Sequence, residues 1–276
     1  MILNPDLVYK RMMKKLFTLL FLFVAFVSHA QRTLFGSNNN YVEPIVLAEP
    51  SIVTDGLIFN VDAANTSSYS GSGNVWNDLK GTNNVKFYSN SAYNVNANPT
   101  YSIDGGGSLI TTGIFGKSIN NSGITGSVAR SMEAWVKFNS VAGNAVISIG
   151  GSVTLNNTLY ELMAFSNNAI EHIWGTFTKS STVLTTNTWY HIVIIYDGTT
   201  NHFVYINGVQ VGVSTSVDRN NLALNTGNTP IYIGTAVTTS WGAFDGKIGA
   251  LRLYNRALSS ADVTANFNAL KSRFGL

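Results

Sequence analysis

Three glutamates, Glu133, Glu161 and Glu171, could carry acid–base chemistry if two of them shared one face of a hairpin. Hydrolysis of a glycosidic bond with retention needs two carboxyl groups about 5 Å apart. Glu133 has no acidic neighbour in its own apolar segment. A turn at 166–168 could bring Glu161 opposite Glu171, although an exposed or hydrogen-bonded pair is the simpler interpretation. The spacing therefore predicts no catalytic residue and a protein that is not an enzyme.

Aromatic side chains are the groups best suited to hold a ligand. Sugar rings stack on exposed aromatic faces, and tyrosine and tryptophan add a polar group. Trp174 follows Ile173 in a predicted strand, so one of the two faces outward, and Trp241 lies in a glycine-flanked loop. With Tyr160 they are the candidate ligand-binding residues, and ordinary packing is the alternative for each. The histidines in the predicted strands are too far apart in the sequence to indicate a zinc motif.

The elements that must position these groups are short β-strands. Residues 132–138 end in an apolar–polar alternation, as expected of a half-buried strand. Residues 189–196 are almost all apolar, which predicts a central strand covered on both faces. Asn207-Gly208 predicts a type I′ hairpin turn, and 159–165 is expected to pair with 170–177. Many closely spaced strands without alternating helices predict an all-β antiparallel sandwich or jelly roll.

One helix is expected, near the C-terminus. Ser259 is a candidate N-cap with Asp262 three residues on, a relative of the capping box. Val263, Phe267 and Leu270 follow at helical spacing and so form one apolar face. This pattern predicts a short helix packed against the sandwich, with a partner-binding helix as the alternative.

The N-terminus carries the features of an export signal. Lys14 and Lys15 precede an apolar run over 16–27, and Ser28-His29-Ala30 provides small residues for cleavage. The run is shorter than the roughly 20 residues of a membrane span, so an uncleaved anchor is the weaker alternative. We therefore expect a signal peptide over 1–30, a linker over 31–54 and one domain over 55–276. No membrane span is expected after cleavage.

Composition narrows the class of partner. The leader holds four of the 17 basic residues and one of the 14 acidic ones, so the remainder carries equal numbers of each. Nucleic-acid binding needs a clustered basic face, and the basic residues are scattered, so no nucleic-acid partner is expected. Cysteine is absent, which excludes disulfides and thiolate sites. With the leader, this indicates a bacterial protein, extracellular or periplasmic.

Four stretches in order resemble the laminin G-like jelly-roll domains, of bacterial and phage type, in the concanavalin A-like lectin/glucanase superfamily. They are G-L-I-F-N-V-D-A-A-N-T-S-S-Y at 56–69, M-E-A-W-V-K-F at 132–138, N-T-W-Y-H-I-V at 187–193 and F-D-G-K-I-G-A-L-R-L-Y-N-R-A-L-S at 244–259. The resemblance covers 55–276 and implies two antiparallel sheets. It also implies core positions for Trp135 and Trp189 and a structural hydrogen bond for His191.

The resemblance further implies a structural Ca²⁺, bound by acidic side chains and backbone carbonyls. Many bacterial members have I-D-E-V in the last strand, where this chain has Ile248-Gly249-Ala250-Leu251. Both acids are therefore missing, which puts that part of a calcium site in doubt. Asp62 and Asp104, near predicted strand ends, remain the candidate metal ligands, with turn capping as the alternative.

Members of the superfamily bind glycans, bind proteins, form parts of virions or cleave polysaccharides, so the fold does not choose among these functions. We expect a secreted, non-catalytic recognition module that binds carbohydrate at the cell surface or outside the cell. The alternative is a structural or adhesive protein-binding module, including a phage-type structural protein, with a surface protein as partner. A glycoside hydrolase is the third and weakest interpretation.

Overall fold

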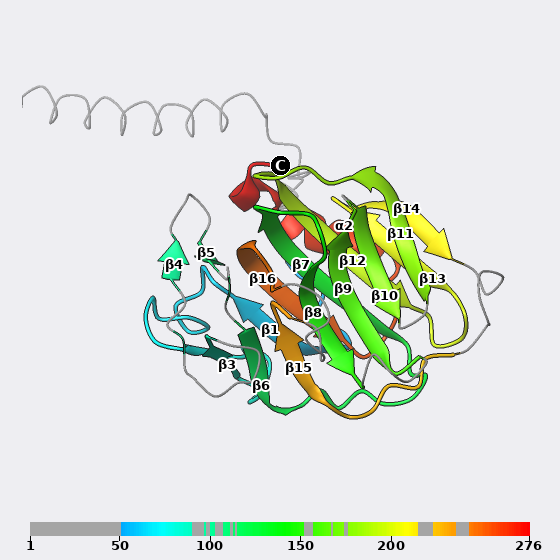
Figure 1. Ribbon diagram of the computed structural model, residues 1–276, viewed down its shortest axis with the longest axis horizontal. Coiled ribbons are helices and arrows are strands. Elements are labelled where there is room, and N and C mark those ends of the chain that lie inside the picture. The colour runs from blue at the N-terminus through cyan, green and yellow to red at the C-terminus, as the bar shows by residue number, and fades with distance from the viewer. Residues whose placement is uncertain are drawn as a thin grey trace, which may run out of the picture. The chain divides into compact units, whose positions relative to one another are not determined.

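The chain folds into a two-sheet antiparallel jelly-roll sandwich with a short C-terminal helix (Figure 1). The structure is a computed structural model that describes residues 51–89, 97, 100–102, 107–110, 113, 115–151, 157–166, 168–173, 176–214, 223–235 and 243–276. Sheet A has the strand order β14-β13-β12-β7-β16-β5-β4, and β1 also pairs with β16. Sheet B has the order β11-β10-β9-β8-β15-β6-β3-β2.

The strands of sheet A are β1 (Leu57–Asp62), β4 (Thr100–Ser102), β5 (Ser108–Ile110), β7 (Arg130–Phe138), β12 (Trp189–Tyr196), β13 (His202–Ile206), β14 (Val209–Ser214) and β16 (Gly246–Tyr254). Those of sheet B are β2 (Val75–Trp76), β3 (Val85–Tyr88), β6 (Phe115–Asn121), β8 (Asn144–Gly150), β9 (Leu159–Phe165), β10 (Asn168–Ile173), β11 (Thr176–Val183) and β15 (Pro230–Ile233).

One apolar core fills the space between the inner faces of the sheets. Alternate residues of β7 and β12, among them Met132 and Ile192, meet alternate residues of β8 and β9 there. Trp76, on the edge strand β2, is fully buried in this core, and its ring centroid lies 6.1 Å from that of Phe87. The pattern of alternating strands therefore predicted the core layer correctly.

The central strand β12 is covered on both faces, as its apolar sequence predicts. Ile192 and Ile194 point into the core between the sheets. Val193 and Ile195 point outward and pack against Val263 of helix α2 (Ser260–Leu270). A sheet face that would otherwise meet water is thus closed by the helix.

Two hairpin predictions are confirmed and one strand prediction is wrong. Asn207 and Gly208 join β13 to β14 with φ of 52° and 81°, as a type I′ turn requires. Strands β9 and β10 pair from Phe165 opposite Asn168, around the expected turn. The strand expected over 170–177 is instead two strands, because β10 ends at Ile173 and β11 begins at Thr176, directly opposite it. In the sequence Gly175 stands between these two strands, and glycine is a residue type that favours hairpin turns.

The helix begins where the capping pattern places it. The Ser259 hydroxyl accepts a hydrogen bond from the Asp262 backbone N–H, and the Asp262 carboxylate accepts one from the Ser259 N–H. A 3₁₀ turn, η1 (Lys271–Phe274), follows α2 and ends at Gly275, whose φ is 73°. Trp135 is fully buried as expected, but it lies under this C-terminal segment, packed against Phe274, and not between the sheets.

The domain also includes residues that the sequence assigns to the linker. Ile52 and Val53 pack against the apolar cluster beneath α2. The Val53 N–H donates to Asn266 Oδ1 over 2.7 Å, and its carbonyl accepts from the Tyr254 hydroxyl over 3.2 Å. Packing against the domain therefore starts a few residues before the expected boundary at 55.

Candidate functional site

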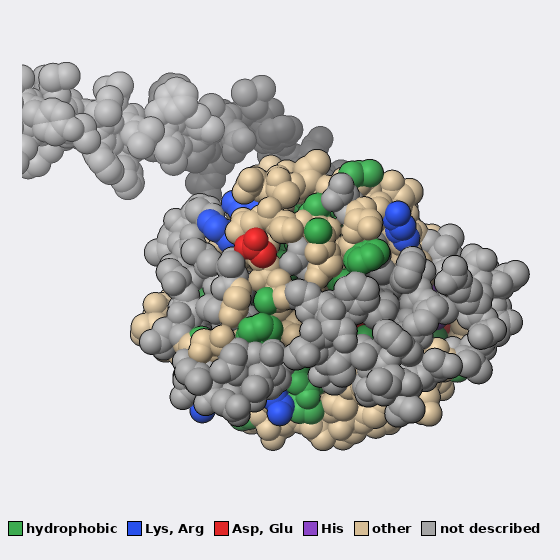
Figure 2. Space-filling view, in the orientation of Figure 1, with side chains coloured by type: hydrophobic (Ala, Val, Ile, Leu, Met, Phe, Trp, Pro, Cys, Tyr) green, Lys and Arg blue, Asp and Glu red, His purple; other side chains and the backbone are tan. Residues whose placement is uncertain are grey.

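The C-terminal segment covers one of the two outer faces of the sandwich. Helix α2 and η1 lie on the outer face of sheet A, where Phe267, Leu270 and Phe274 pack around Trp135. A binding surface on a sheet is therefore to be sought on the outer face of sheet B, whose strands lie in front in Figure 1. In the space-filling view of that side, the described side chains are mostly uncharged, with scattered Lys and Arg and an acidic group near the top (Figure 2).

A row of residues crosses the outer face of sheet B, and we call it the sheet B row. The register pairs successive members of the row across β3, β6, β15, β8 and β9: Lys86, Lys117, Tyr232, Ser148 and Glu161. Directly paired residues point to the same side of a sheet. The sequence neighbours of Tyr232 are both core residues, so the row lies on the outer side.

One end of the sheet B row has the chemistry of a ligand-binding surface. Lys86, Lys117 and Tyr232 are each partly exposed. The Lys117 Nζ lies 6.0 Å from the Tyr232 ring centroid, and the Lys86 Nζ lies 5.9 Å from that of Tyr88. A tyrosine phenol is protonated at neutral pH, and burial raises the pKa of Tyr232 further above its ordinary value. This end combines aromatic faces with hydrogen-bond donors.

The other end of the row is closed and does not form a carboxylate dyad. Ser148 and Glu161 are fully buried, and the Ser148 hydroxyl donates to the Thr235 carbonyl over 3.2 Å. The register pairs Glu161 with His172, and it pairs Glu171 with Leu162. A dyad across this hairpin would need Glu161 paired with Glu171, and the register instead puts these two residues at positions on opposite faces of the hairpin.

The predicted ligand residues are distributed differently from expectation. Trp174, Trp241 and the candidate metal ligand Asp104 lie outside the residues that the structure describes. Tyr160 is fully buried in the core, and the Arg130 guanidinium lies 5.8 Å from its ring centroid. The prediction that Tyr160 binds a sugar is therefore wrong. Position 160 alternates onto the inner face of β9, so the ring has no contact with solvent.

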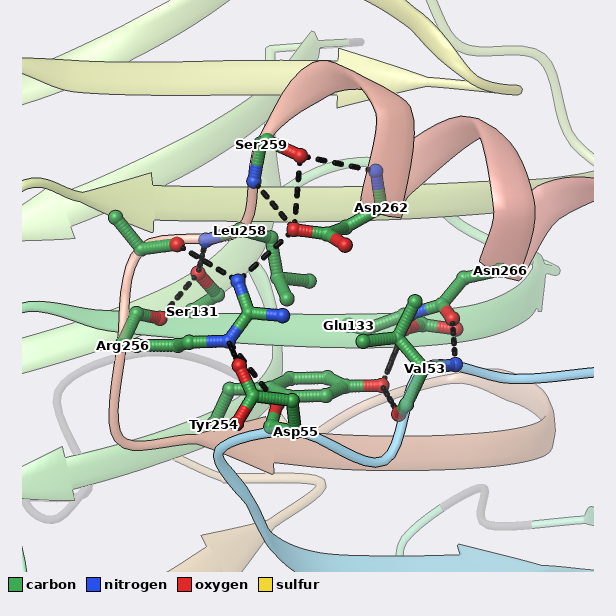
Figure 3. A network of polar contacts seen from close by, with 11 residues as sticks. Val53, Asp55, Ser131, Glu133, Tyr254, Arg256, Leu258, Ser259, Asp262 and Asn266 are labelled. Carbon is green, nitrogen blue, oxygen red and sulfur yellow. Dashed lines mark hydrogen bonds and ion pairs between the residues drawn. The ribbon is translucent and has the colours of Figure 1, made fainter.

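A buried polar network lies under α2, on the covered face of sheet A, and Figure 3 shows its members Glu133, Tyr254 and Asn266. Its centre is Glu133 of β7, which is fully buried. Arg252 Nη1 of β16 lies 2.5 Å from Glu133 Oε1, and His191 Nε2 of β12 lies 3.2 Å from the same oxygen. Asn266 Nδ2 of α2 donates to Glu133 Oε2 over 2.5 Å. The network therefore ties three strands to the helix.

The charges in this network keep the carboxylate ionised. Burial alone would raise the pKa of Glu133, but the Arg252 guanidinium and His191 outweigh it and lower that pKa to about 2. Burial, followed by the charge of Glu133, raises the pKa of the neighbouring Tyr254 phenol. A general acid needs a raised carboxyl pKa, so Glu133 is suited to a structural role. His191 belongs to this network through its 3.2 Å approach to Glu133. Neither ring nitrogen has a hydrogen bond of regular geometry, so the structural hydrogen bond that the resemblance implies stays a prediction.

Asp62 does not have free oxygens for a metal. Arg273 Nη1 lies 2.7 Å and 2.8 Å from its two carboxylate oxygens, and the Ala64 N–H also donates to Oδ1. Among the described residues, no three His, Cys, Asp or Glu side chains gather as a metal site would require. The fit of Asp62 as a Ca²⁺ ligand is therefore poor, because an internal cation already holds both oxygens.

The chain belongs to the concanavalin A-like lectin/glucanases superfamily, whose family model matches residues 104–264, more than half of the sequence. This agrees with the fold and with the resemblance of the sequence stretches. No curated protein matches the chain. Among the described residues no helix has the length and apolar content needed to cross a bilayer.

Solved structures share the fold at low sequence identity. Domain 4 of AbnA, a GH43 extracellular arabinanase from Geobacillus stearothermophilus in complex with arabinotriose, is 18% identical with a TM-score of 0.58, covering 75% of this chain and 96% of that domain. The binding domain of Paraclostridial mosquitocidal protein 1 is 14% identical with a TM-score of 0.57, covering 78% and 52%. A botulinum neurotoxin type C structure, described as interacting with two ganglioside molecules, is 14% identical with a TM-score of 0.54, covering 78% and 51%.

Tyr232, an aromatic residue that the structure places on the outer face of sheet B, was missed from the sequence. Its signal was present, because Ile231-Tyr232-Ile233 alternates as a half-buried strand does. The alternation alone does not say whether the opposite face is open or covered. That depends on which distant segments pack on each face: Ser148 and Glu161 lie on the same face as Tyr232 and are fully buried.

Proposed function

We propose that this protein is an exported, non-catalytic recognition module that binds carbohydrate on the outer face of sheet B. The observation that carries the proposal is the partly exposed Tyr232 ring with Lys117 beside it. Both residues lie on sheet B, whereas the C-terminal helix packs on sheet A. A tyrosine ring provides a stacking face for a sugar, and its hydroxyl and the ammonium provide hydrogen-bond donors.

Further support comes from relatives of the same fold. The arabinanase domain, 96% of which is covered by this chain, was solved with arabinotriose. The superfamily also contains glucanases, but Glu161 and Glu171 are not paired, and Glu133 is locked in a structural network. The non-catalytic part of the proposal rests on these two features of the carboxylates. Export rests on the leader predicted over 1–30.

The test is binding of residues 31–276 to a glycan array, followed by calorimetry with arabinan and acidic oligosaccharides. Tyr232→Ala is expected to weaken binding about fivefold, since stacking of one aromatic ring contributes about 1 kcal/mol. Tyr232→Phe, which keeps the ring, should retain most of the affinity. Val209→Ala, at an exposed position on sheet A, serves as the matched control and should bind like wild type.

Three results would reject the proposal. Binding that is unchanged in Tyr232→Ala would remove the sheet B row as the site. Capture of a protein partner that is insensitive to deglycosylation, with no glycan bound, would favour the structural or adhesive alternative. Release of reducing ends from a polysaccharide, abolished by Glu161→Gln, would show instead that the protein is a hydrolase.

A further inference from the structure

Four oxygen atoms from three parts of the chain converge on the guanidinium of Arg273. Nη1 contacts both carboxylate oxygens of Asp62, at the end of β1. Nη2 donates to the carbonyl of Gly107 over 2.9 Å and to that of Gly249, in β16, over 3.3 Å. The Asp62 and Arg273 side chains are 14% and 16% exposed, so this cluster is largely removed from water.

This donor set is one that a hard cation would use. Calcium in proteins is held by oxygen atoms alone, from carboxylates and backbone carbonyls. Here the same donors, one carboxylate and two carbonyls, surround a guanidinium, which is always charged and offers planar N–H donors. We propose that Arg273 is a built-in replacement for a divalent cation, so that the folded domain needs no calcium at Asp62.

The way in which Arg273 reaches the cluster supports this assignment. It lies in η1, and the next residue, Phe274, packs its ring on Trp135 with centroids 4.5 Å apart. A Cβ at position 249 would lie 2.4 Å from the Phe274 ring, so only glycine admits the ring there. Ala250, directly opposite Asp62 in the sheet, belongs to the same apolar cluster.

The absence of acidic residues at positions 249 and 250 therefore has one explanation. Gly249 leaves space for the Phe274 ring, and Ala250 packs in the same apolar cluster. These contacts fix η1 in the position from which Arg273 binds Asp62. The Arg273 guanidinium carbon lies 4.7 Å from the Phe274 ring centroid, which adds a cation–π contact. An acidic side chain at position 249 would clash with the Phe274 ring and so displace η1, which positions the Arg273 guanidinium. The chain thus holds either the C-terminal arginine or a side chain at position 249.

The experiment compares thermal unfolding of residues 31–276 in millimolar calcium and in EDTA. Wild type should unfold at the same temperature in both, because a ligand raises Tm only if it binds the folded state. Arg273→Ala should lower Tm in EDTA by about 5–10 °C, since it leaves a largely buried carboxylate without its cation. Calcium should then restore part of the loss, by entering the vacated oxygen cluster. Arg273→Ala combined with Asp62→Asn should lose the calcium response.

The control is Arg256→Ala, which removes an arginine paired with Asp55 and Asp262 away from this cluster. Any loss in that variant should be indifferent to calcium. Arg273→Lys, which keeps a cation, should fold and show no calcium response, and it provides the readout if Arg273→Ala fails to fold. A wild-type Tm that rises with calcium, an Arg273→Ala variant as stable as wild type, or one indifferent to calcium would each overturn the proposal. So would a calcium response of Arg273→Lys.

Discussion

Replacing Glu133 by glutamine tests whether the buried network holds the C-terminal helix to sheet A. Glutamine has the same shape, so packing around Trp135 and Val263 should be preserved. The change removes the negative charge that faces Arg252, whose side chain is only 2% exposed. It also replaces one of the two carboxylate oxygens by an amide NH₂ group, and Asn266 Nδ2 needs an oxygen to accept its hydrogen bond.

The size of the effect follows from burial. Removing one partner of a buried ion pair destabilises a protein by about 3–5 kcal/mol, because the other charge remains buried without compensation. In a domain of this size that corresponds to a drop in Tm of about 10 °C. The lowered pKa of Glu133 corresponds to a loss of similar size. The pKa of Glu133 falls from 4.5 to about 2 on folding, which corresponds to about 3 kcal/mol.

The sign of the pH effect is fixed by that direction. Because the folded-state pKa of Glu133 is lowered, its stabilisation is complete above the unfolded value of 4.5 and is lost as the pH falls toward 2. Urea denaturation followed by tryptophan fluorescence should show the free energy of unfolding of wild type falling across this window. In Glu133→Gln the stability should be low at neutral pH and its fall between pH 5 and pH 2 should be smaller.

The double variant Glu133→Gln with Arg252→Met separates charge from packing. If the unpaired guanidinium causes the loss, removing it as well should recover a large part of the stability, since apolar replacement of a buried ion pair is often neutral. A Glu133→Gln variant within about 1 kcal/mol of wild type, or one with the same acid transition as wild type, would refute the role assigned to this carboxylate.

Two smaller changes test how the helix is held in place. Gly249→Ala should cost about 1–3 kcal/mol, because the added Cβ meets the Phe274 ring; a chemical denaturation midpoint equal to that of wild type would show that the turn can move aside. Ser259→Ala should cost about 1 kcal/mol by removing the hydroxyl that caps α2, whereas Ser260→Ala, one position further on, is expected to be near neutral. The same denaturation assay serves for both changes, and equal losses at 259 and 260 would contradict the capping argument.

The sequence by itself determined the class of fold, the turns and the helix. Apolar alternation marks the two faces of a strand, and Asn207-Gly208 and Ser259 carry local backbone preferences that act over a few residues. These signals are local, so they survive without knowledge of the tertiary structure. The prediction of a single strand over 170–177 was wrong, because a short break inside a strand-like segment gives only a weak local signal for a turn.

Only the tertiary structure decided what the charged and aromatic residues do. Trp135 and Tyr160 are both aromatic strand residues, yet the first is buried by the helix and the second by the opposite sheet. Asp62 has the residue type of a calcium ligand, but its partner Arg273 lies 211 residues away in the sequence. Burial and electrostatic partners depend on which distant segments meet, and periodicity within one strand carries no information about that.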